Sequence, residues 1–362
     1  MLAPLRIAVI GTGHLGRIHA KLLSQVDGAE LTHVVDPNVE TADAIAQTHG
    51  VRHAATHGEI LSDFDAAIVA APTGLHASIV GDLLRAGKHV LCEKPLTVRS
   101  DDAAELATLA RQNRLTLQVG HVERFNPAFT ALGDFARDVK YVECVRASSF
   151  PGRCLDVGVV MDLMIHDLDL ILSLTNAPVI DVRGSGVAVV SDHEDIAEAR
   201  LEFGCGLVAN VKANRVAVTP TRSMQLYGPA GFADIDFGTP SLTTVAASKS
   251  LADRTFDLNT ATDDPLTYRD DLFADHLRVE QQTLSARNAI LDEQNDFVLS
   301  IRSGTPSVVD GDAGARAVDL AERITRALAK RSWYDGLSTT TRGIHVTPRR
   351  DSVTTVPARR AA

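Results

Sequence analysis

The chain has 362 residues, of which 45% are hydrophobic and 23% charged, and its formal net charge is −10. This length predicts two domains, and the composition is typical of a globular protein rather than a disordered one. The negative charge argues against a nucleic-acid or anionic membrane partner.

Two further features indicate a cytoplasmic protein. No apolar run is long enough to span a bilayer, and the opening MLAPLRIAVIG enters a strand without room for a signal peptide. The four cysteines, Cys92, Cys144, Cys154 and Cys205, form no CxxC pair, so we expect reduced thiols rather than disulfides.

Short apolar runs alternate with helical patterns through the first third of the chain. The expected strands are residues 5–11, 30–36, 65–72, 89–93 and 115–121, and the expected helices are 14–26, 39–50, 76–87 and 100–113. Uniformly apolar strands separated by single helices predict a parallel sheet covered on both faces. Residues 1–125 are therefore expected to form a doubly wound α/β domain.

The pattern changes after residue 125. A strand at 141–150 and a helix of about four turns at 159–174 precede a series of strands at 180–190, 196–203, 206–215, 223–228 and 230–237. Glycine-containing turns between these strands predict a largely antiparallel open sheet, followed by helices around 286–303 and 312–331. We expect residues 126–340 to form an α+β domain for substrate binding and oligomerisation, and 341–362 a flexible tail that holds paired arginines.

The stretch GTGHLG supplies Gly11, Gly13 and Gly16 in the spacing G-x-G-x-x-G. The motif lies between the first strand and the first helix, which is the context that dinucleotide binding requires. In such a loop the backbone approaches a pyrophosphate, and the free N–H groups of the helix N-terminus face the phosphates.

Asp36 ends the second strand, 20 residues after Gly16. A carboxylate there can accept hydrogen bonds from both ribose hydroxyls and would repel a 2′-phosphate, which favours NAD over NADP. The alternative is that Asp36 only caps the next helix.

The stretch LCEKPLTV places Lys94 and Pro95 directly after a buried strand. Proline restricts Lys94 to extended geometry and permits a tight or cis turn, which would aim the ammonium in one direction. A solvated lysine at a strand end is the alternative.

Asp162 and His166 are four residues apart in MDLMIHDLD, so on a helix they share a face, with Asp169 one turn beyond. A carboxylate beside an imidazole orients it and raises its proton affinity, as a base that deprotonates a hydroxyl needs. A surface pair is the alternative, and no metal is expected.

The sequence resembles the Gfo/Idh/MocA family of NAD(P)-dependent oxidoreductases as far as about residue 335. The resemblance is carried by GTGHLG at 11–16, APTGLH at 71–76, CEKP at 92–95, GHVERFNP at 120–127 and the D-x-x-x-H of Asp162 and His166. It implies a Rossmann domain joined to an open, mostly antiparallel sheet, with the active site at their junction. Many members have a glycine where this chain has Met164.

By this resemblance Lys94, Asp162 and His166 match the catalytic positions, and either His166 or Lys94 is the base. The expected cofactor-binding residues are Gly11, Thr12, Gly13, His14, Leu15, Gly16, Asp36, Ala71, Pro72, Thr73, His76, Glu93 and Lys94. The expected substrate-binding residues are Lys94, Arg124, Asn126, Asp162, His166 and Arg215. His76 is equally compatible with a core role, and Arg124 with an ion pair to Glu123.

Within the family, GHVERFNPAF and RCLDVGVVMDLMIHDLDL look most like the UDP-N-acetylglucosamine 3-dehydrogenase branch. The expected reaction is NAD-dependent oxidation of a secondary hydroxyl of a sugar or nucleotide sugar, with Arg124, Arg153 and Arg215 as candidate diphosphate ligands. An inositol or free-sugar dehydrogenase, and a catalytically idle NAD-binding regulator, are the alternatives. The open sheet predicts a homodimer or homotetramer.

Overall fold

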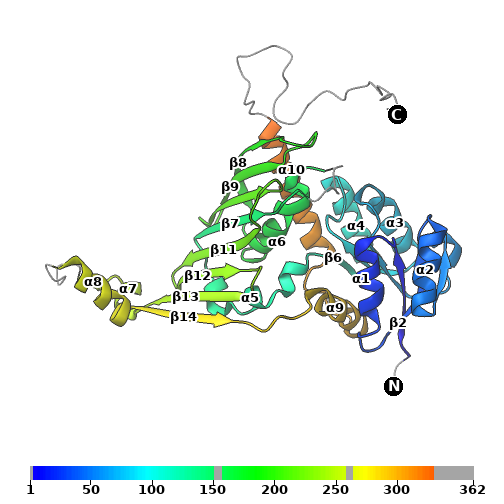
Figure 1. The fold of residues 1–362 in the computed structure, drawn as a ribbon, viewed down its shortest axis with the longest axis horizontal. Coiled ribbons are helices and arrows are strands. Elements are labelled where there is room, and N and C mark those ends of the chain that lie inside the picture. Colours follow the sequence, from blue (N-terminus) through cyan, green and yellow to red (C-terminus); the bar gives the residue numbers. More distant parts are fainter. Residues whose placement is uncertain (1–2, 151–156, 258–263, 330–362) are drawn as a thin grey trace, which may run out of the picture.

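A computed structural model describes residues 3–150, 157–257 and 264–329 (Figure 1). The predicted tail at 341–362 lies outside the described residues, as do Arg153 and Cys154. Within the described parts, no helix has both the length and the apolarity of a membrane span.

The first sheet is parallel and has the strand order β3-β2-β1-β4-β5-β6. Its strands are β1 (Leu5–Ile10), β2 (Ala29–Val35), β3 (Arg52–Ala54), β4 (Ala66–Val69), β5 (His89–Glu93) and β6 (Leu117–Gly120). The strands β2 and β3 are added on one side of β1, and β4, β5 and β6 on the other side. Doubly wound sheets bind ligands at such a switch in strand order, here between β1 and β4. The predicted Rossmann architecture is confirmed.

The helices of this half are α1 (His14–Leu23), α2 (Val39–His49), η1 (His57–Ile60), α3 (Thr73–Arg85) and α4 (Ser100–Asn113). Apolar side chains of the strands and helices form two buried clusters, one of which includes Ile7, Leu23 and Phe297. Phe297 belongs to α9 (Ala289–Ser303), so this late helix packs against the first sheet.

The second sheet is mostly antiparallel, as predicted, with the order β14-β13-β12-β11-β7-β10-β9-β8 and one parallel pair, β7 with β10. Its strands are β7 (Tyr141–Ala147), β8 (Val179–Val187), β9 (Ile196–Phe203), β10 (Val208–Asn214), β11 (Thr221–Gly228), β12 (Gly231–Asp236), β13 (Ser241–Ala247) and β14 (Leu277–Thr283). Helices α6 (Ile165–Ser173) and α10 (Gly311–Ala329) lie against one face (Figure 1). The residues between the sheets include η2 (Val122–Phe125), α5 (Pro127–Thr130) and η3 (Gly133–Ala136).

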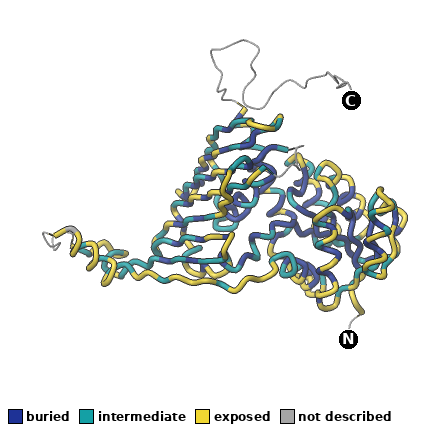
Figure 2. Tube along the Cα trace, in the orientation of Figure 1, coloured by how far each residue is buried: buried dark blue, intermediate teal, exposed yellow. Residues whose placement is uncertain are grey.

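The burial pattern alternates along the strands of the second sheet, so one face is buried and the other exposed (Figure 2). An arm extends from the edge beyond β13 and contains α7 (Lys249–Ala252), α8 (Pro265–Asp271) and η6 (Leu272–His276). Neither this arm nor the strands β3, β13 and β14 were expected from the sequence. The boundary at residues 125 and 126 falls at the end of η2 and stays a prediction.

The helix predicted at 159–174 does not begin as a regular α-helix. Residues Val160–Met164 (η4) form a π-helical turn, and the α-helix α6 starts only at Ile165. A π-turn is wider than an α-turn and is frequent at functional sites. Residues four apart across it no longer stack as they would on a regular α-helix, which affects Asp162 and His166.

Candidate active site

The carboxyl ends of four neighbouring parallel strands place the candidate residues along one edge of the first sheet. Gly11 follows β1, Ala71 follows β4, Lys94 follows β5 and His121 follows β6. Because β1, β4, β5 and β6 are adjacent in this order, segments far apart in the sequence meet at this edge.

The glycine loop leaves room for a dinucleotide. Gly11 has φ +94°, and a Cβ on it would lie 2.6 Å from the backbone of Ala70. Nothing lies within 4 Å of the Cβ position of Gly13, and α1 begins there with no side-chain cap. The uncapped N–H groups beside open space are suited to a pyrophosphate. His14 and Leu15 begin α1 beside this space.

Asp36 is bound to the same loop. Its carboxylate accepts hydrogen bonds from Thr12 N and Thr12 Oγ1, both at 2.8 Å, and from Asn38 N at 2.9 Å. Partial burial opposes ionisation, but these hydrogen bonds outweigh it and lower the pKa of Asp36. The carboxylate is thus ionised and held beside the loop, with its side chain still partly accessible.

The 71–76 segment connects the cofactor loop to the lysine turn. Pro72 is exposed and precedes α3, which Thr73 begins. His76 is buried, and its ring nitrogens lie 2.8 Å from the Ala71 carbonyl oxygen and 2.9 Å from that of Pro95. His76 therefore links the end of β4 to the turn after Lys94, in agreement with the core role that the sequence left open.

Lys94 reaches from the first sheet to the helix of the second. The Lys94–Pro95 peptide bond is cis, and the Lys94 N–H donates to Glu93 Oε2 at 3.2 Å. Lys94 Nζ lies 2.7 Å from the Asp162 backbone oxygen and 3.4 Å from its Oδ1. The ammonium is directed into the junction between the two sheets, so Lys94 is not a solvated lysine at a strand end.

Asp162 does not hold His166 as expected. No hydrogen bond joins their side chains in the described part of the chain, and the Asp162 carboxylate pairs with Lys94 instead. The π-turn at Val160–Met164 is the physical reason, because its wider turn displaces Asp162 relative to His166.

His166 lies at the same junction and is a neutral imidazole at pH 7. Burial and then the positive charges of Lys94 and Arg146 lower its pKa well below the ordinary value. The predicted direction, a raised proton affinity, is therefore wrong. The residue is half-buried, and its Nδ1 is buried and has no hydrogen-bond partner among the described residues. The other nitrogen, Nε2, is not among the buried atoms without a partner, so it is the one available to accept a proton.

Two predicted substrate ligands are engaged with the protein. Arg124 forms a bidentate pair with Asp169 at 2.7 and 3.1 Å, rather than with Glu123. Asn126 caps α5 by accepting from Ala128 N at 3.0 Å and donates to Glu123 Oε2 at 3.1 Å.

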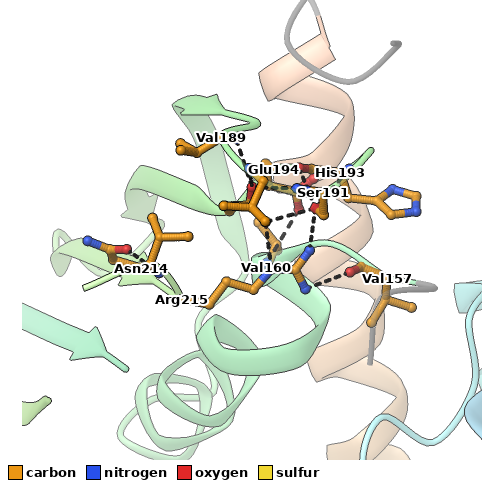
Figure 3. Close-up of polar contacts among 11 residues, drawn as sticks. Val157, Val160, Val189, Ser191, His193, Glu194, Asn214 and Arg215 are labelled. Atoms are coloured by element: carbon orange, nitrogen blue, oxygen red, sulfur yellow. Dashed lines mark hydrogen bonds and ion pairs between the residues drawn. The ribbon is translucent and has the colours of Figure 1, made fainter. Parts of the chain in front are cut away.

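Arg215 lies in a buried polar cluster at the start of the π-turn (Figure 3). Its side chain is 0% exposed and binds Asp195 Oδ1 at 2.9 Å. It also donates to the Val157 carbonyl oxygen at 2.9 Å and to Ser191 Oγ at 2.8 Å. These contacts indicate a structural role, and direct substrate contact by Arg215 stays an untested prediction.

Several polar side chains close to these residues were not expected from the sequence. His19 on α1 lies 2.8 Å from Glu93 Oε1, and Gln294 of α9 contacts the His19 ring at 2.9 Å. Arg146 on β7 pairs with Asp167 at 2.7 Å and Glu123 at 2.8 Å. Spacing gives no signal for these contacts, because their partners are distant in the sequence.

His121 was also missed, although it lies inside the GHVERFNP motif. It is 1% exposed, and its ring lies edge-to-face with that of His166, with 6.2 Å between centroids. Arg222 on β11 is a further cation nearby, 3.7 Å from Glu123 and with its side chain 48% exposed.

Comparisons with known proteins agree with this geometry. Residues 5–121 match the family model described as "Oxidoreductase family, NAD-binding Rossmann fold", and residues 138–234 match "GFO/IDH/MocA C-terminal domain". UDP-N-acetylglucosamine 3-dehydrogenase from Acidithiobacillus ferrooxidans is 34% identical over 90% of this chain and 97% of its own length.

The solved structure of that enzyme superposes with a TM-score of 0.79 and covers 90% of this chain and 98% of the other. A scyllo-inositol 2-dehydrogenase (NAD(+)) from Bacillus subtilis is 29% identical over 59% of this chain and 68% of its own length. The chain therefore belongs to the Gfo/Idh/MocA family of oxidoreductases, dehydrogenases that act on CH–OH groups with a nicotinamide cofactor.

Proposed function

We propose that this protein oxidises a secondary hydroxyl of a nucleotide sugar with NAD, and that the 3-hydroxyl of UDP-N-acetylglucosamine is its substrate. The observation that carries the proposal is the meeting of Lys94 Nζ, Asp162 and a neutral His166 at the nucleotide-binding edge. The relative from A. ferrooxidans supports the choice of substrate.

The proposed mechanism assigns one proton transfer to the chain. His166 Nε2 accepts the hydroxyl proton because the imidazole is neutral and this nitrogen, unlike Nδ1, is not among the buried atoms without a partner. Lys94 donates a hydrogen bond to the same oxygen and stabilises the developing alkoxide. A nicotinamide bound at this edge supplies the acceptor for the hydride that leaves the carbinol carbon.

Lys94 is the alternative base. The Lys94 ammonium already donates to the backbone oxygen and the carboxylate of Asp162. Lys94 can act as a base only after losing a proton, and both of these contacts stabilise its protonated form. His166 needs no such step, which is why the geometry favours the imidazole as the base and the ammonium as the donor.

The cofactor proposal is NAD rather than NADP. Asp36 is ionised beside the glycine loop and retains accessible surface, so it can accept from the ribose hydroxyls. A 2′-phosphate at this position would meet the carboxylate and be repelled.

A nucleotide sugar also requires ligands for its diphosphate. Arg124 and Arg215 are bound to Asp169 and Asp195, whereas the half-exposed Arg222 is the more accessible guanidinium near the site. We add Arg222 to the candidates for this role.

An inositol or free-sugar dehydrogenase is the second candidate, favoured by the B. subtilis relative. The experiment that separates the candidates is to supply NAD with UDP-N-acetylglucosamine, scyllo-inositol, myo-inositol or free hexoses and to record NADH at 340 nm. Turnover of the nucleotide sugar alone supports the proposal, and turnover of inositol alone reassigns the substrate. A chain that binds NAD but turns over none of them would be the idle regulator.

We also propose a cytoplasmic homo-oligomer that forms through the exposed face of the second sheet. Tyr141, Tyr227 and Phe232 stack on this face, with ring centroids 5.7 and 4.7 Å apart, and Val145 beside them is 37% exposed. An exposed aromatic patch of this kind is typical of a protein interface. Light scattering of Tyr227→Lys beside the wild type tests it, because a lysine there should dissociate the oligomer.

A further inference from the structure

His121 and His166 contain an unusual concentration of unsatisfied polar atoms. Eight buried side-chain nitrogen or oxygen atoms lack a hydrogen-bond partner in the described part of the chain, and three of them are on these two rings. They are both ring nitrogens of His121 and Nδ1 of His166. A buried polar group without a partner is costly, so each one calls for an explanation.

A phenylalanine would fill the position of His121 without that cost. The residue is 1% exposed, and its ring packs edge-to-face against His166 with an interplanar angle of 88°. Edge-to-face packing needs only an aromatic ring. The two nitrogens of His121 therefore contribute something other than packing.

The chemistry of His166 indicates what that is. A neutral imidazole carries its proton on only one of its two nitrogens. The hydrogen bond that one nitrogen makes determines which of the two is protonated. A base that accepts a proton at Nε2 must carry its own proton on Nδ1. The expected orienting group, Asp162, is bound to Lys94, so it does not perform this function.

His121 is the imidazole that packs against this ring, and both of its own nitrogens are buried. It follows β6, whereas His166 lies on α6, so the pair spans the junction between the two sheets. The ring centroids lie 6.2 Å apart at an interplanar angle of 88°, so the two imidazoles are direct neighbours across this junction.

We propose that His121 is a positioning residue for His166: it holds the proton of His166 on the buried Nδ1 and so leaves Nε2 as the acceptor of the substrate's hydroxyl proton. The catalytic consequence rests on the proposed function, whereas the choice of tautomer does not. Nothing is oxidised or reduced in this step, and one proton moves from the substrate oxygen to Nε2.

The electrostatic setting of the pair is consistent with this role. Burial lowers the pKa of both rings, and a charge on His121 lowers the pKa of His166 further. The charged groups around His121 are Asp169, Arg124, Lys94 and Glu93, and those around His166 are Lys94, Arg146 and Arg222. All of these charged groups remain when His121 alone is replaced. Any change in the tautomer or the pKa of His166 is therefore due to the loss of His121.

The experiment reads the tautomer directly, by the ring ¹⁵N chemical shifts of His166 in the protein without substrate. Wild type, His121→Phe, His121→Gln and His33→Phe are compared, and His166→Asn assigns the signal. His33 is the matched control, since it is another buried imidazole of the parallel sheet with an unpartnered Nδ1. Wild type and His33→Phe should show the Nδ1–H form of His166.

His121→Phe should show a mixture of tautomers or the Nε2–H form, and the pKa of His166 should rise, because His121 is one of the groups that lower it in the wild type. On the substrate that the wild type oxidises, kcat should fall by about 10- to 100-fold, with KM and the Kd of NAD unchanged. His121→Gln, which keeps a polar group, should recover part of the loss.

The proposal is overturned if the His166 shifts and titration are the same in wild type, His121→Phe and His33→Phe. Should His121→Phe not fold, a His121→Gln variant with wild-type shifts and a wild-type titration overturns it equally. Because these shifts are measured without substrate, failure to oxidise a nucleotide sugar would reject the proposed function and leave this test intact.

Discussion

Lys94 Nζ donates a hydrogen bond to the backbone oxygen of Asp162 at 2.7 Å and lies 3.4 Å from its carboxylate. This contact joins the carboxyl edge of the first sheet to the π-turn before α6. It also gives Asp162 a role that spacing did not predict, because the carboxylate positions the ammonium instead of the imidazole.

Asp162→Asn should therefore lower kcat without moving the titration of His166. The backbone oxygen still accepts from Lys94, but the negative charge that holds the ammonium is lost, so we expect a fall of about 10- to 100-fold. The pH profile of kcat/KM measures both effects. A shift of its acid limb by one pH unit or more to lower pH would show that Asp162 acts on the imidazole after all.

The pH dependence of the wild type follows from the lowered pKa of His166. The active form is the neutral imidazole, which predominates above its pKa, so activity should be lost only as the pH falls through that value. Because burial and Lys94 lower the pKa, the midpoint of the acid limb should lie below about 6.5, the ordinary value for histidine. A midpoint above 7 in kcat/KM would contradict this electrostatic description.

Asp36→Ser should weaken NAD binding and reduce discrimination against NADP. The serine removes the negative charge and most of the hydrogen bonds that Thr12 and the ribose would make. We expect the Kd of NAD to rise about tenfold, the equivalent of one or two hydrogen bonds, and the ratio of the Kd values for NADP and NAD to fall. Fluorescence titration measures both, and an unchanged ratio would mean that Asp36 only holds the loop.

Arg215→Met should destabilise the protein far more than it affects catalysis. The guanidinium is fully buried against Asp195, so its removal leaves a buried carboxylate without its cation and should cost about 3–5 kcal/mol. Arg183→Met is the matched control, because Arg183 and its partner Asp181 are exposed and such pairs contribute about 0–1 kcal/mol. Urea unfolding compares the two. A stable Arg215→Met variant with a greatly raised KM would instead establish Arg215 as a substrate ligand.

Most of the fold could be predicted from local patterns. The alternation of apolar strands and helices gave the parallel sheet, and the glycine motif with Asp36 gave its nucleotide-binding edge, because these signals lie within short stretches. Strand β14 was missed because its sequence, LRVEQQT, is mostly polar and the strand is ordered by pairing with β13 rather than by its own periodicity.

The site could be predicted only in part. Lys94 and His166 lie within recognisable motifs, but the π-turn that redirects Asp162 depends on packing that the i, i+4 spacing does not contain. Pairs such as Arg124 with Asp169 and Arg215 with Asp195 depend on which strands become neighbours, and so does the meeting of His121 with His166. None of these is encoded by spacing along the chain.

The most direct test is the rate of NADH formation after rapid mixing of NAD-loaded enzyme with the substrate that the wild type oxidises, measured for wild type, His166→Ala and Lys94→Ala. We expect each variant to lose about 10²- to 10⁴-fold in this rate and to bind NAD with a Kd within about twofold of wild type, a difference below 1 kcal/mol. Near-wild-type rates in both variants would show that the amine and the imidazole at this junction do not carry the reaction.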